Sequence, residues 1–156
     1  MKTMKIESVF QPLQSIPSKY TCDGENIAPP LSFIHVPEFA RSLVLIMDDP
    51  DAQDVCGKIF DHWIVGNIPV DIHKLSEGAP ELLGLSHDIF VGKNHYNLNT
   101  YKGPCPPPGK PHHYHFKLYA LDQILSLPYG VTKEDVEDAM KGHVIEQAEL
   151  IGIYQR

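Results

Sequence analysis

The feature that most constrains this chain is a short apolar segment, residues 42–47, that ends abruptly in acidic residues and a proline. Its length and its β-branched content favour a central strand that is buried on both faces. Pro50 lacks a backbone N–H and cannot continue a central ladder, so the strand is predicted to end at Asp48 and Asp49.

Two further segments have the composition of strands. Residues 62–68 are largely apolar and are closed by Pro69. In residues 113–120, Tyr114, Phe116 and Leu118 alternate with more polar neighbours, which predicts one apolar face and one mixed face. Fourteen prolines and eleven glycines favour a turn-rich protein over a helical bundle, without reaching the level typical of disorder.

The C-terminal part predicts the one long helix. Thr132 is a favourable N-cap, and Glu134 and Asp135 place negative charge in the first turn. Apolar residues then recur at helical spacing: Val136, Ala139, Met140, Val144 and Ala148. Gly142 weakens a helix interior by about 1 kcal/mol relative to alanine and marks a point where the helix can break. A shorter helical turn is compatible with residues 120–127, so we expect a β-rich core with one or two helices.

Length and charge limit the classes of protein. The 156 residues, 42% of them hydrophobic, fit one domain spanning 1–156 with a core that needs no metal or disulfide. The formal charge of −7 disfavours binding to nucleic acid and to anionic membrane surfaces. No apolar run reaches the roughly 18 residues of a membrane span, and residues 1–8 lack a signal-peptide core. We therefore expect a cytoplasmic protein without membrane insertion. In such a reducing compartment the default expectation for cysteines is the free thiol, here for Cys22, Cys56 and Cys105.

Polar residues gather where the predicted strands begin or end, at residues 48–52, 61–63 and 111–115. Asp49 has the parity of the apolar residues before it, and His112 shares a face with Tyr114 and Phe116. Both side chains are therefore expected to point toward the core, where an unpaired polar group is costly. Residues 70–111 form a long irregular excursion, and an ordered loop of that length usually serves a site.

Each of these segments also has a simpler interpretation. Asp48 and Asp51 suit a turn whose side chains satisfy local backbone N–H groups. His113 and His115 suit exposed strand positions, and His62 suits a hydrogen-bonded core histidine.

Metal binding is the rival chemical hypothesis, because four residues offer nitrogen and oxygen ligands without a diagnostic spacing: Asp49, His62, His113 and His115. Nucleophilic catalysis has less support. No Gly-x-Ser-x-Gly motif occurs, and Cys105 lies between two prolines rather than at a helix N-terminus that would lower its pKa.

Six short motifs follow one another along the chain: Tyr-Thr-Cys-Asp-Gly at 20–24, Pro-Pro-Leu at 29–31, Asp-Pro-Asp-Ala at 49–52, His-Trp-Ile-Val at 62–65, Gly-Pro-Cys-Pro-Pro at 103–107 and His-His-Tyr at 112–114. Each is short, but the ordered set resembles the phosphatidylethanolamine-binding protein family, also called Raf kinase inhibitor-like proteins, in its short prokaryotic form. Residues 142–154 are also similar to the prokaryotic branch, so the resemblance covers nearly the whole chain.

The resemblance implies an antiparallel β-sandwich with Greek-key character, flanked by one or two helices including a C-terminal one. It also implies a small anion pocket at one end of the central sheet, with nine ligand-binding positions: Asp49, Asp51, Ala52, His62, Gly103, Pro104, Cys105, His112 and Tyr114. The motifs that contain Cys22 and Cys105 converge in the family, so a bridge between these thiols is compatible with an oxidising setting.

Chemistry assigns roles within that pocket. His62, His112 and Tyr114 are expected to donate to a phosphate. Asp49 is expected to orient His62 through a ring N–H, or to accept an ammonium group. Affinity for the anion should then weaken as His62 and His112 lose their protons.

The expected function is non-enzymatic binding of small anionic or phosphorylated ligands, such as phosphoethanolamine-like head groups, without catalytic residues, metal or cofactor. By analogy with the family, the protein is also expected to regulate a kinase or protease partner. The resemblance is compatible with a homodimer. The alternative is a metal-dependent or acid–base hydrolase that uses Asp49, His62 and His112. Two residues depart from the family pattern: Gln53 replaces a usual proline, and His113 replaces a usual arginine, which makes the rim less basic at neutral pH.

Overall fold

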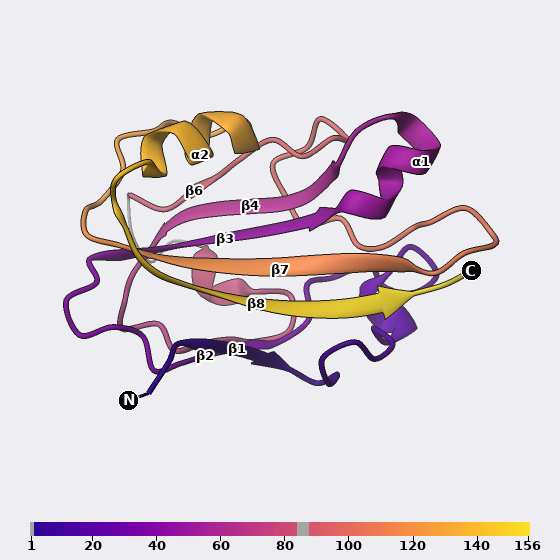
Figure 1. Cartoon of the computed structure of the whole chain (residues 1–156), viewed down its shortest axis with the longest axis horizontal. Helices are drawn as coiled ribbons and strands as arrows, with labels where there is room; N and C mark the ends of the chain where they lie inside the picture. The colour runs from indigo at the N-terminus through magenta and orange to yellow at the C-terminus, as the bar shows by residue number, and fades with distance from the viewer. Residues whose placement is uncertain (1, 84–87) are drawn as a thin grey trace.

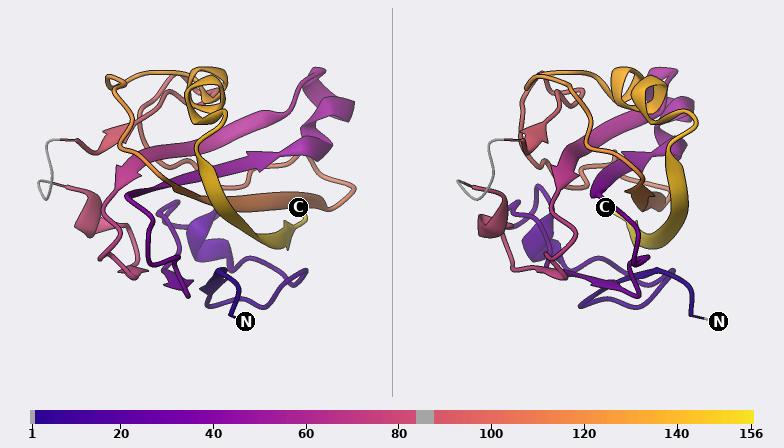
Figure 2. Two further views of the ribbon diagram at one scale, coloured as in Figure 1. Left: turned by 60° about the vertical axis from the view of Figure 1, so that its left-hand side comes forward. Right: turned by 90° about the vertical axis from the view of Figure 1, so that its left-hand side faces the viewer.

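The apolar run at residues 42–47 lies within the central strand β3 (Ser42–Asp49) of a five-stranded antiparallel sheet. The computed structural model describes residues 2–83 and 88–156 and contains two sheets and a helical layer (Figures 1 and 2). The larger sheet has the order β6 (Phe90–Val91), β4 (Phe60–Ile68), β3, β7 (His112–Leu121) and β8 (Val144–Tyr154). The smaller sheet has the order β1 (Lys5–Ser8), β2 (Leu31–Ile34) and β5 (Lys74–Leu75).

The helical elements are short. Three 3-10 turns, η1 (Ser18–Tyr20), η2 (Pro50–Ala52) and η3 (Pro80–Leu82), accompany two α-helices, α1 (Gln53–Cys56) and α2 (Lys133–Met140). Of the irregular excursion predicted for residues 70–111, residues 84–87 lie outside the described part; the rest contains only β5, η3 and β6. The mostly β, sandwich-like fold class is confirmed.

The predicted central strand is confirmed, because all eight residues of β3 are buried. Pro50 begins η2 directly after Asp49, as the missing N–H of proline requires. β3 pairs with its sequence neighbour β4 on one side and, after the long excursion, with β7 on the other. This arrangement brings residues near 49, 62 and 112 to one end of the sheet.

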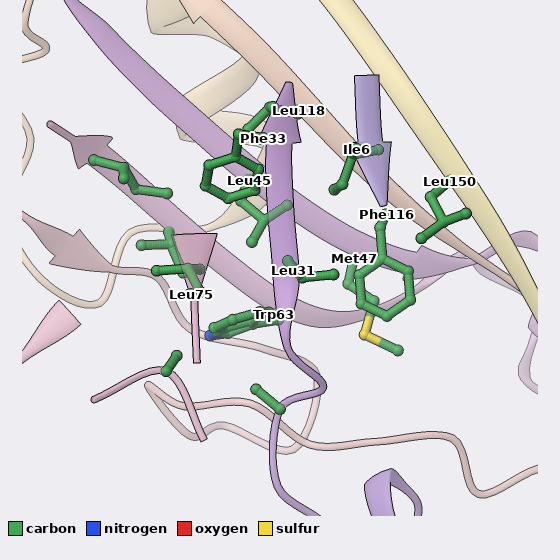
Figure 3. Packing of buried hydrophobic residues seen from close by; sticks show 14 of the residues in the cluster. Ile6, Leu31, Phe33, Leu45, Met47, Trp63, Leu75, Phe116, Leu118 and Leu150 are labelled. Atoms are coloured by element: carbon green, nitrogen blue, oxygen red, sulfur yellow. The ribbon is translucent and has the colours of Figure 1, made fainter. Parts of the chain in front are cut away.

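Alternating side chains of the large sheet enter two separate cores. Leu45, Met47, Phe116 and Leu118 face the small sheet, where they pack with residues of β1, β2 and β5 (Figure 3). Val44, Ile46 and Ile64 face the other way and pack beneath α2, against Val136 and Met140. The large sheet is therefore covered on both faces, which explains its continuous apolar strands.

The C-terminal helix is shorter than predicted. It begins as expected, with a capping box in which the Thr132 side chain accepts from the Asp135 backbone N–H. It ends at Met140, and Gly142 then adopts φ +80°. Residues from Val144 onward form β8, which pairs with the whole of β7, so the prediction of helix as far as Ala148 is wrong. The helical turn proposed for 120–127 is also absent, since Ala120 and Leu121 end β7.

The expectation of three thiols is wrong for two of the cysteines. Cys22 and Cys105 form a disulfide across 83 residues of sequence, with their Cα atoms 5.4 Å apart, and Cys56 is free and exposed. Within residues 2–83 and 88–156, no helix has the length and hydropathy required to cross a membrane.

Candidate functional site

A small pocket opens beside α1, where β3 ends and where β4 and β7 begin. It has a volume of about 160 Å³ and is lined by twelve residues: Asp49, Ala52, Val55, Cys56, Phe60, His62, Tyr96, Cys105, Pro106, Pro107, His112 and Tyr114. At roughly 30 Å³ per water molecule, this volume holds about five waters, the scale of a phosphate group. A larger groove of about 460 Å³ lies between β1 and β8, but none of the residues that line it is a histidine or an aspartate.

The central polar contact of the pocket joins Asp49 to His112. Asp49 Oδ2 lies 2.7 Å from His112 Nδ1, and Asp49 Oδ1 accepts from the backbone N–H of Asp51 at 2.9 Å. Both side chains are less than 10% exposed. Burial raises the pKa of Asp49, although the hydrogen bond from His112 opposes this effect. Asp49 therefore fixes the ring orientation of His112 and directs its Nδ1–H away from the ligand.

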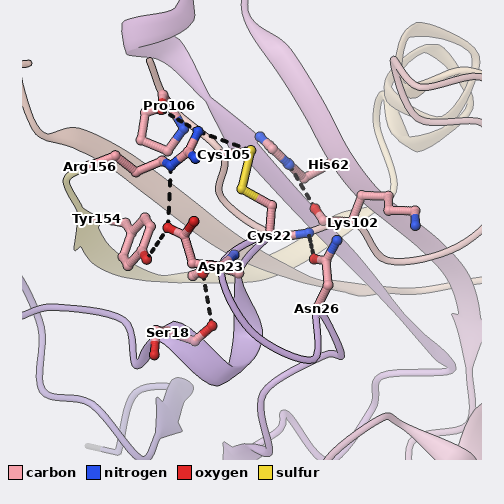
Figure 4. Close-up of a disulfide and its surroundings, with 12 residues drawn as sticks. Ser18, Cys22, Asp23, Asn26, His62, Lys102, Cys105, Pro106, Tyr154 and Arg156 are labelled. Atoms are coloured by element: carbon pink, nitrogen blue, oxygen red, sulfur yellow. Dashed lines mark hydrogen bonds and ion pairs between the residues drawn. A yellow bond between two sulfur atoms is a disulfide. The ribbon is translucent and has the colours of Figure 1, made fainter. Parts of the chain in front are cut away.

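This geometry corrects the role predicted for Asp49 toward His62. His62 Nδ1 donates instead to the backbone carbonyl of Lys102 at 2.7 Å, and the Lys102 N–H donates back to the His62 carbonyl at 3.3 Å (Figure 4). His62 is 3% exposed, and this burial lowers its pKa to about 4, against a smaller opposing effect of the Lys102 carbonyl. His62 is therefore neutral at pH 7, and the expectation that it carries a proton lost near neutrality is wrong.

Aromatic rings surround the two imidazoles. The Tyr114 ring lies 5.4 Å from that of His62 and stacks on His112 at 6.4 Å. Phe60 lies 5.0 Å from both His62 and Tyr96. Burial, reinforced by the nearby charge of Asp49, raises the pKa of Tyr114, so its hydroxyl remains a hydrogen-bond donor at all physiological pH values.

Within the Gly-Pro-Cys-Pro-Pro motif at 103–107, residues 105–107 form one wall of the pocket, and the N-terminal segment supports this wall from the side away from the cavity. The Cys22–Cys105 disulfide links the two (Figure 4). The Cys22 N–H also donates to the Pro104 carbonyl at 3.1 Å. The Gly103 N–H donates to Asn26 Oδ1 at 2.7 Å. A Cβ at Gly103 would collide with the backbone carbonyl of Tyr20, so only glycine permits this approach.

The structure brings six of the nine predicted site residues into the walls of this pocket: Asp49, Ala52, His62, Cys105, His112 and Tyr114. Gly103 and Pro104 brace the wall from outside. Asp51 lines a neighbouring cavity and accepts from the backbone and ring of His113, at 2.6 and 2.8 Å. That these residues bind a ligand stays a prediction.

The structure divides the four residues of the metal hypothesis: Asp49 and His62 line the pocket, whereas His113 and His115 do not. His113 contacts Asp51, and His115 contacts Glu149 at 2.9 Å, on the face of β7 away from the pocket. Within the described ranges, no group of three or more histidine, cysteine or acidic side chains is arranged to hold a metal ion.

Sequence reasoning missed four lining residues: Val55, Cys56, Phe60 and Tyr96. Phe60 could have been found, since it precedes His62 by two residues and so shares its strand face. Pro106 and Pro107 lie in the motif already noted at 103–107. Tyr96 belongs to the long excursion and gives no local signal.

Comparison with known proteins agrees with this arrangement. Residues 6–155 match the family model described as phosphatidylethanolamine-binding protein. A UPF0098 protein of Methanothermobacter thermautotrophicus is 52% identical over 141 residues, which cover 90% of this chain and 91% of the relative. A UPF0098 protein of Pyrococcus abyssi is 46% identical over 156 residues, 98% of this chain and 85% of that protein.

Solved structures give the same result. A phosphatidylethanolamine-binding protein homologue from Chlamydia trachomatis, CT736, superimposes with a TM-score of 0.90 at 42% identity, over 100% of this chain and 99% of that one. E. coli YbcL, described as a member of the mammalian family, superimposes with a TM-score of 0.88 at 27% identity, over 99% of each chain. The chain therefore belongs to the phosphatidylethanolamine-binding protein family.

Proposed function

We propose that the pocket binds small anionic ligands, phosphorylated head groups above all, and holds them without chemical change. The observation that carries the proposal is the buried 2.7 Å contact between Asp49 and His112 inside a cavity of oxyanion size. When both ring nitrogens of His112 carry protons, Nδ1–H donates to Asp49 and Nε2–H is free to donate to an anion. The Tyr114 hydroxyl supplies a second donor.

The amphipathic rim suits a head group on an organic carrier. Phe60, Tyr96 and Val55 line the same pocket, and Val55 and Tyr96 are largely exposed. A phosphorylated amine such as phosphoethanolamine is therefore a suitable probe ligand. The family resemblance adds a kinase or protease as a regulated partner, and this partner is a separate expectation.

The test is a calorimetric titration of phosphoethanolamine into the wild-type protein and the variant Asp49→Asn. Asparagine keeps the size of the side chain and can still accept from the Asp51 N–H, but it removes the charge that holds His112. A hydrogen bond to a charged group contributes about 1.5–3 kcal/mol, so we expect affinity to fall at least tenfold while the fold is retained. Asp54→Asn, an exposed change on α1 that alters net charge equally, is the control. Equal affinity of wild type and Asp49→Asn would refute the proposal.

A second candidate is the acid–base hydrolase, and the same Asp49–His112 contact favours it, because a carboxylate-oriented imidazole is a common general base. Release of inorganic phosphate from phosphoethanolamine and p-nitrophenyl phosphate, measured with and without added zinc or manganese, separates the two. Turnover that disappears in Asp49→Asn would replace the binding function with the hydrolytic one.

A further inference from the structure

His62 presents an acceptor, not a donor, to the pocket. A backbone carbonyl can only accept, so the 2.7 Å contact with Lys102 places the proton of a neutral imidazole on Nδ1. Nε2 then carries a lone pair. Among the described residues no hydrogen-bond partner is found for Nε2, although His62 is 97% buried and lines the pocket. Among the described residues Nε2 is not one of the fully buried atoms that lack a partner, so it is open to the pocket, and a ligand that donates to it gains a hydrogen bond there.

The pocket also lacks a fixed cation. None of its twelve lining residues is lysine or arginine, and Asp49 contributes negative charge. Arg156 touches Cys105 Sγ and the Pro106 carbonyl at 3.6 and 3.5 Å, but its Nε pairs with Asp23 at 3.3 Å. Because the Asp49 carboxylate is already present, each negative charge on a ligand adds repulsion, so a monoanion enters at a lower electrostatic cost than a dianion.

We infer that the pocket takes its phosphate as the singly protonated monoanion of a phosphomonoester, whose own P–OH donates to His62 Nε2 while the charged oxygen accepts from Tyr114 and His112. This inference rests on the proposed function. A phosphodiester has the same single charge but no P–OH, so it would leave Nε2 unpaired. A fully deprotonated monoester would set a charged oxygen against the lone pair. His62 thereby becomes the residue that selects monoester over diester.

Several titratable groups surround His62. The elements packed against it contribute seven of them: Asp48, Asp49, Cys56, His95, Tyr96, His112 and Tyr114. Titration of any of them shifts affinity at a pH set by the protein. Titration of the ligand shifts affinity at a pH set by the ligand. The two origins are therefore distinguishable by changing the ligand alone.

The experiment titrates wild-type protein with methylphosphonate and difluoromethylphosphonate from pH 5 to pH 9.5. Fluorine withdraws electrons and lowers the second pKa of the ligand with little change in shape. We expect affinity per total ligand to fall about tenfold per pH unit above each ligand's second pKa. This pKa is about 6 for phosphate monoesters and higher for methylphosphonate, because carbon withdraws fewer electrons than the ester oxygen. The onset should be displaced to lower pH for the fluorinated compound. A common onset for both compounds would assign the titration to the protein and overturn the inference.

Dimethyl phosphate and methyl phosphate, compared at pH 5.5, test the missing donor directly. We expect the diester to bind at least tenfold more weakly. Equal affinities would overturn the inference and leave the proposed function standing, whereas no binding of either compound at any pH would overturn both.

The variant His62→Gln supplies an amide that can donate as well as accept, so the preference for monoester over diester should shrink to within about twofold. His115→Gln, the same change at a residue bonded to Glu149 outside the pocket, should keep the wild-type preference. Nitrogen-15 spectra of the wild type at pH 7 should show His62 as the Nδ1–H tautomer. An Nε2–H tautomer would overturn the inference without any variant.

Discussion

Two adjacent aspartates on β3 have opposite environments. Asp48 points toward α2, where its Oδ2 pairs with Lys117 at 3.0 Å and with Lys133 at 3.3 Å. Asp49 points toward the small-sheet side, where its partner is His112 and a cavity lies beside it. Both carboxylates are buried. Only the partners and the adjoining space differ.

The difference separates a structural ion cluster from a binding site. Lys133 pairs with Asp61 at 2.8 Å as well as with Asp48. Burial alone would lower the pKa of Lys133, but the two carboxylates raise it overall, so its charge is permanent. On the Asp48 side, fixed cations neutralise the carboxylates, although Asp48 Oδ1 has no hydrogen-bond partner among the described residues. On the Asp49 side the partner is a titratable imidazole with a second nitrogen to offer, and this leaves capacity for a ligand.

The largest effect is expected from breaking the ion cluster with Lys133→Met. Removing one partner leaves buried carboxylates uncompensated, a change that typically costs about 3–5 kcal/mol. Urea unfolding measures the loss, and phosphoethanolamine affinity of the folded variant should stay within about twofold of wild type. Lys141→Met removes an exposed pair with Asp138 on the same segment and should have no measurable effect on stability. Equal stability of the two variants would contradict the distinction drawn between the two aspartates.

A smaller effect concerns acid stability and His62. Its pKa is about 4 in the folded protein against an ordinary value of 6.5, so the unfolded chain binds a proton first as the pH falls. Stability is therefore complete above pH 6.5 and declines toward pH 4, by about 3 kcal/mol at 1.36 kcal/mol per pH unit. Denaturant unfolding at several pH values should show that His62→Gln loses this part of the pH dependence. If His62→Gln keeps the wild-type slope, burial does not hold His62 neutral.

The smallest effect is expected from Asp51→Asn, two residues beyond Asp49. Burial alone would raise the pKa of Asp51, but hydrogen bonds from the backbone and ring of His113 lower it overall. Its contribution to stability is thus present above pH 4 and is lost as the pH falls through the folded value. Because this pair is about 40% exposed, it should contribute less than about 1 kcal/mol. Phosphoethanolamine affinity should change less than twofold; a tenfold loss would place Asp51 in the binding site itself.

The alternation of residues along the strands was sufficient to predict toward which face of the sheet several side chains point. The period of two in a strand assigns Asp49 to the face of Leu45 and Met47, and His112 to that of Phe116, and the structure has them there. The same pattern failed at the C-terminus. Val144 and Ala148 are four residues apart, a spacing that fits one face of a helix and equally one face of a strand. Pairing with β7 decided between them.

The sequence by itself determined the buried central strand, its end at Pro50, the start of the C-terminal helix and the membership of Asp49 and His112 in one face, because each follows from backbone chemistry and local periodicity. Only the tertiary structure decided that Asp49 pairs with His112 rather than His62, that Cys22 reaches Cys105, and that His62 is neutral. These depend on strand register, including the shift between Met47 and Asp48, and on desolvation by residues distant in the chain.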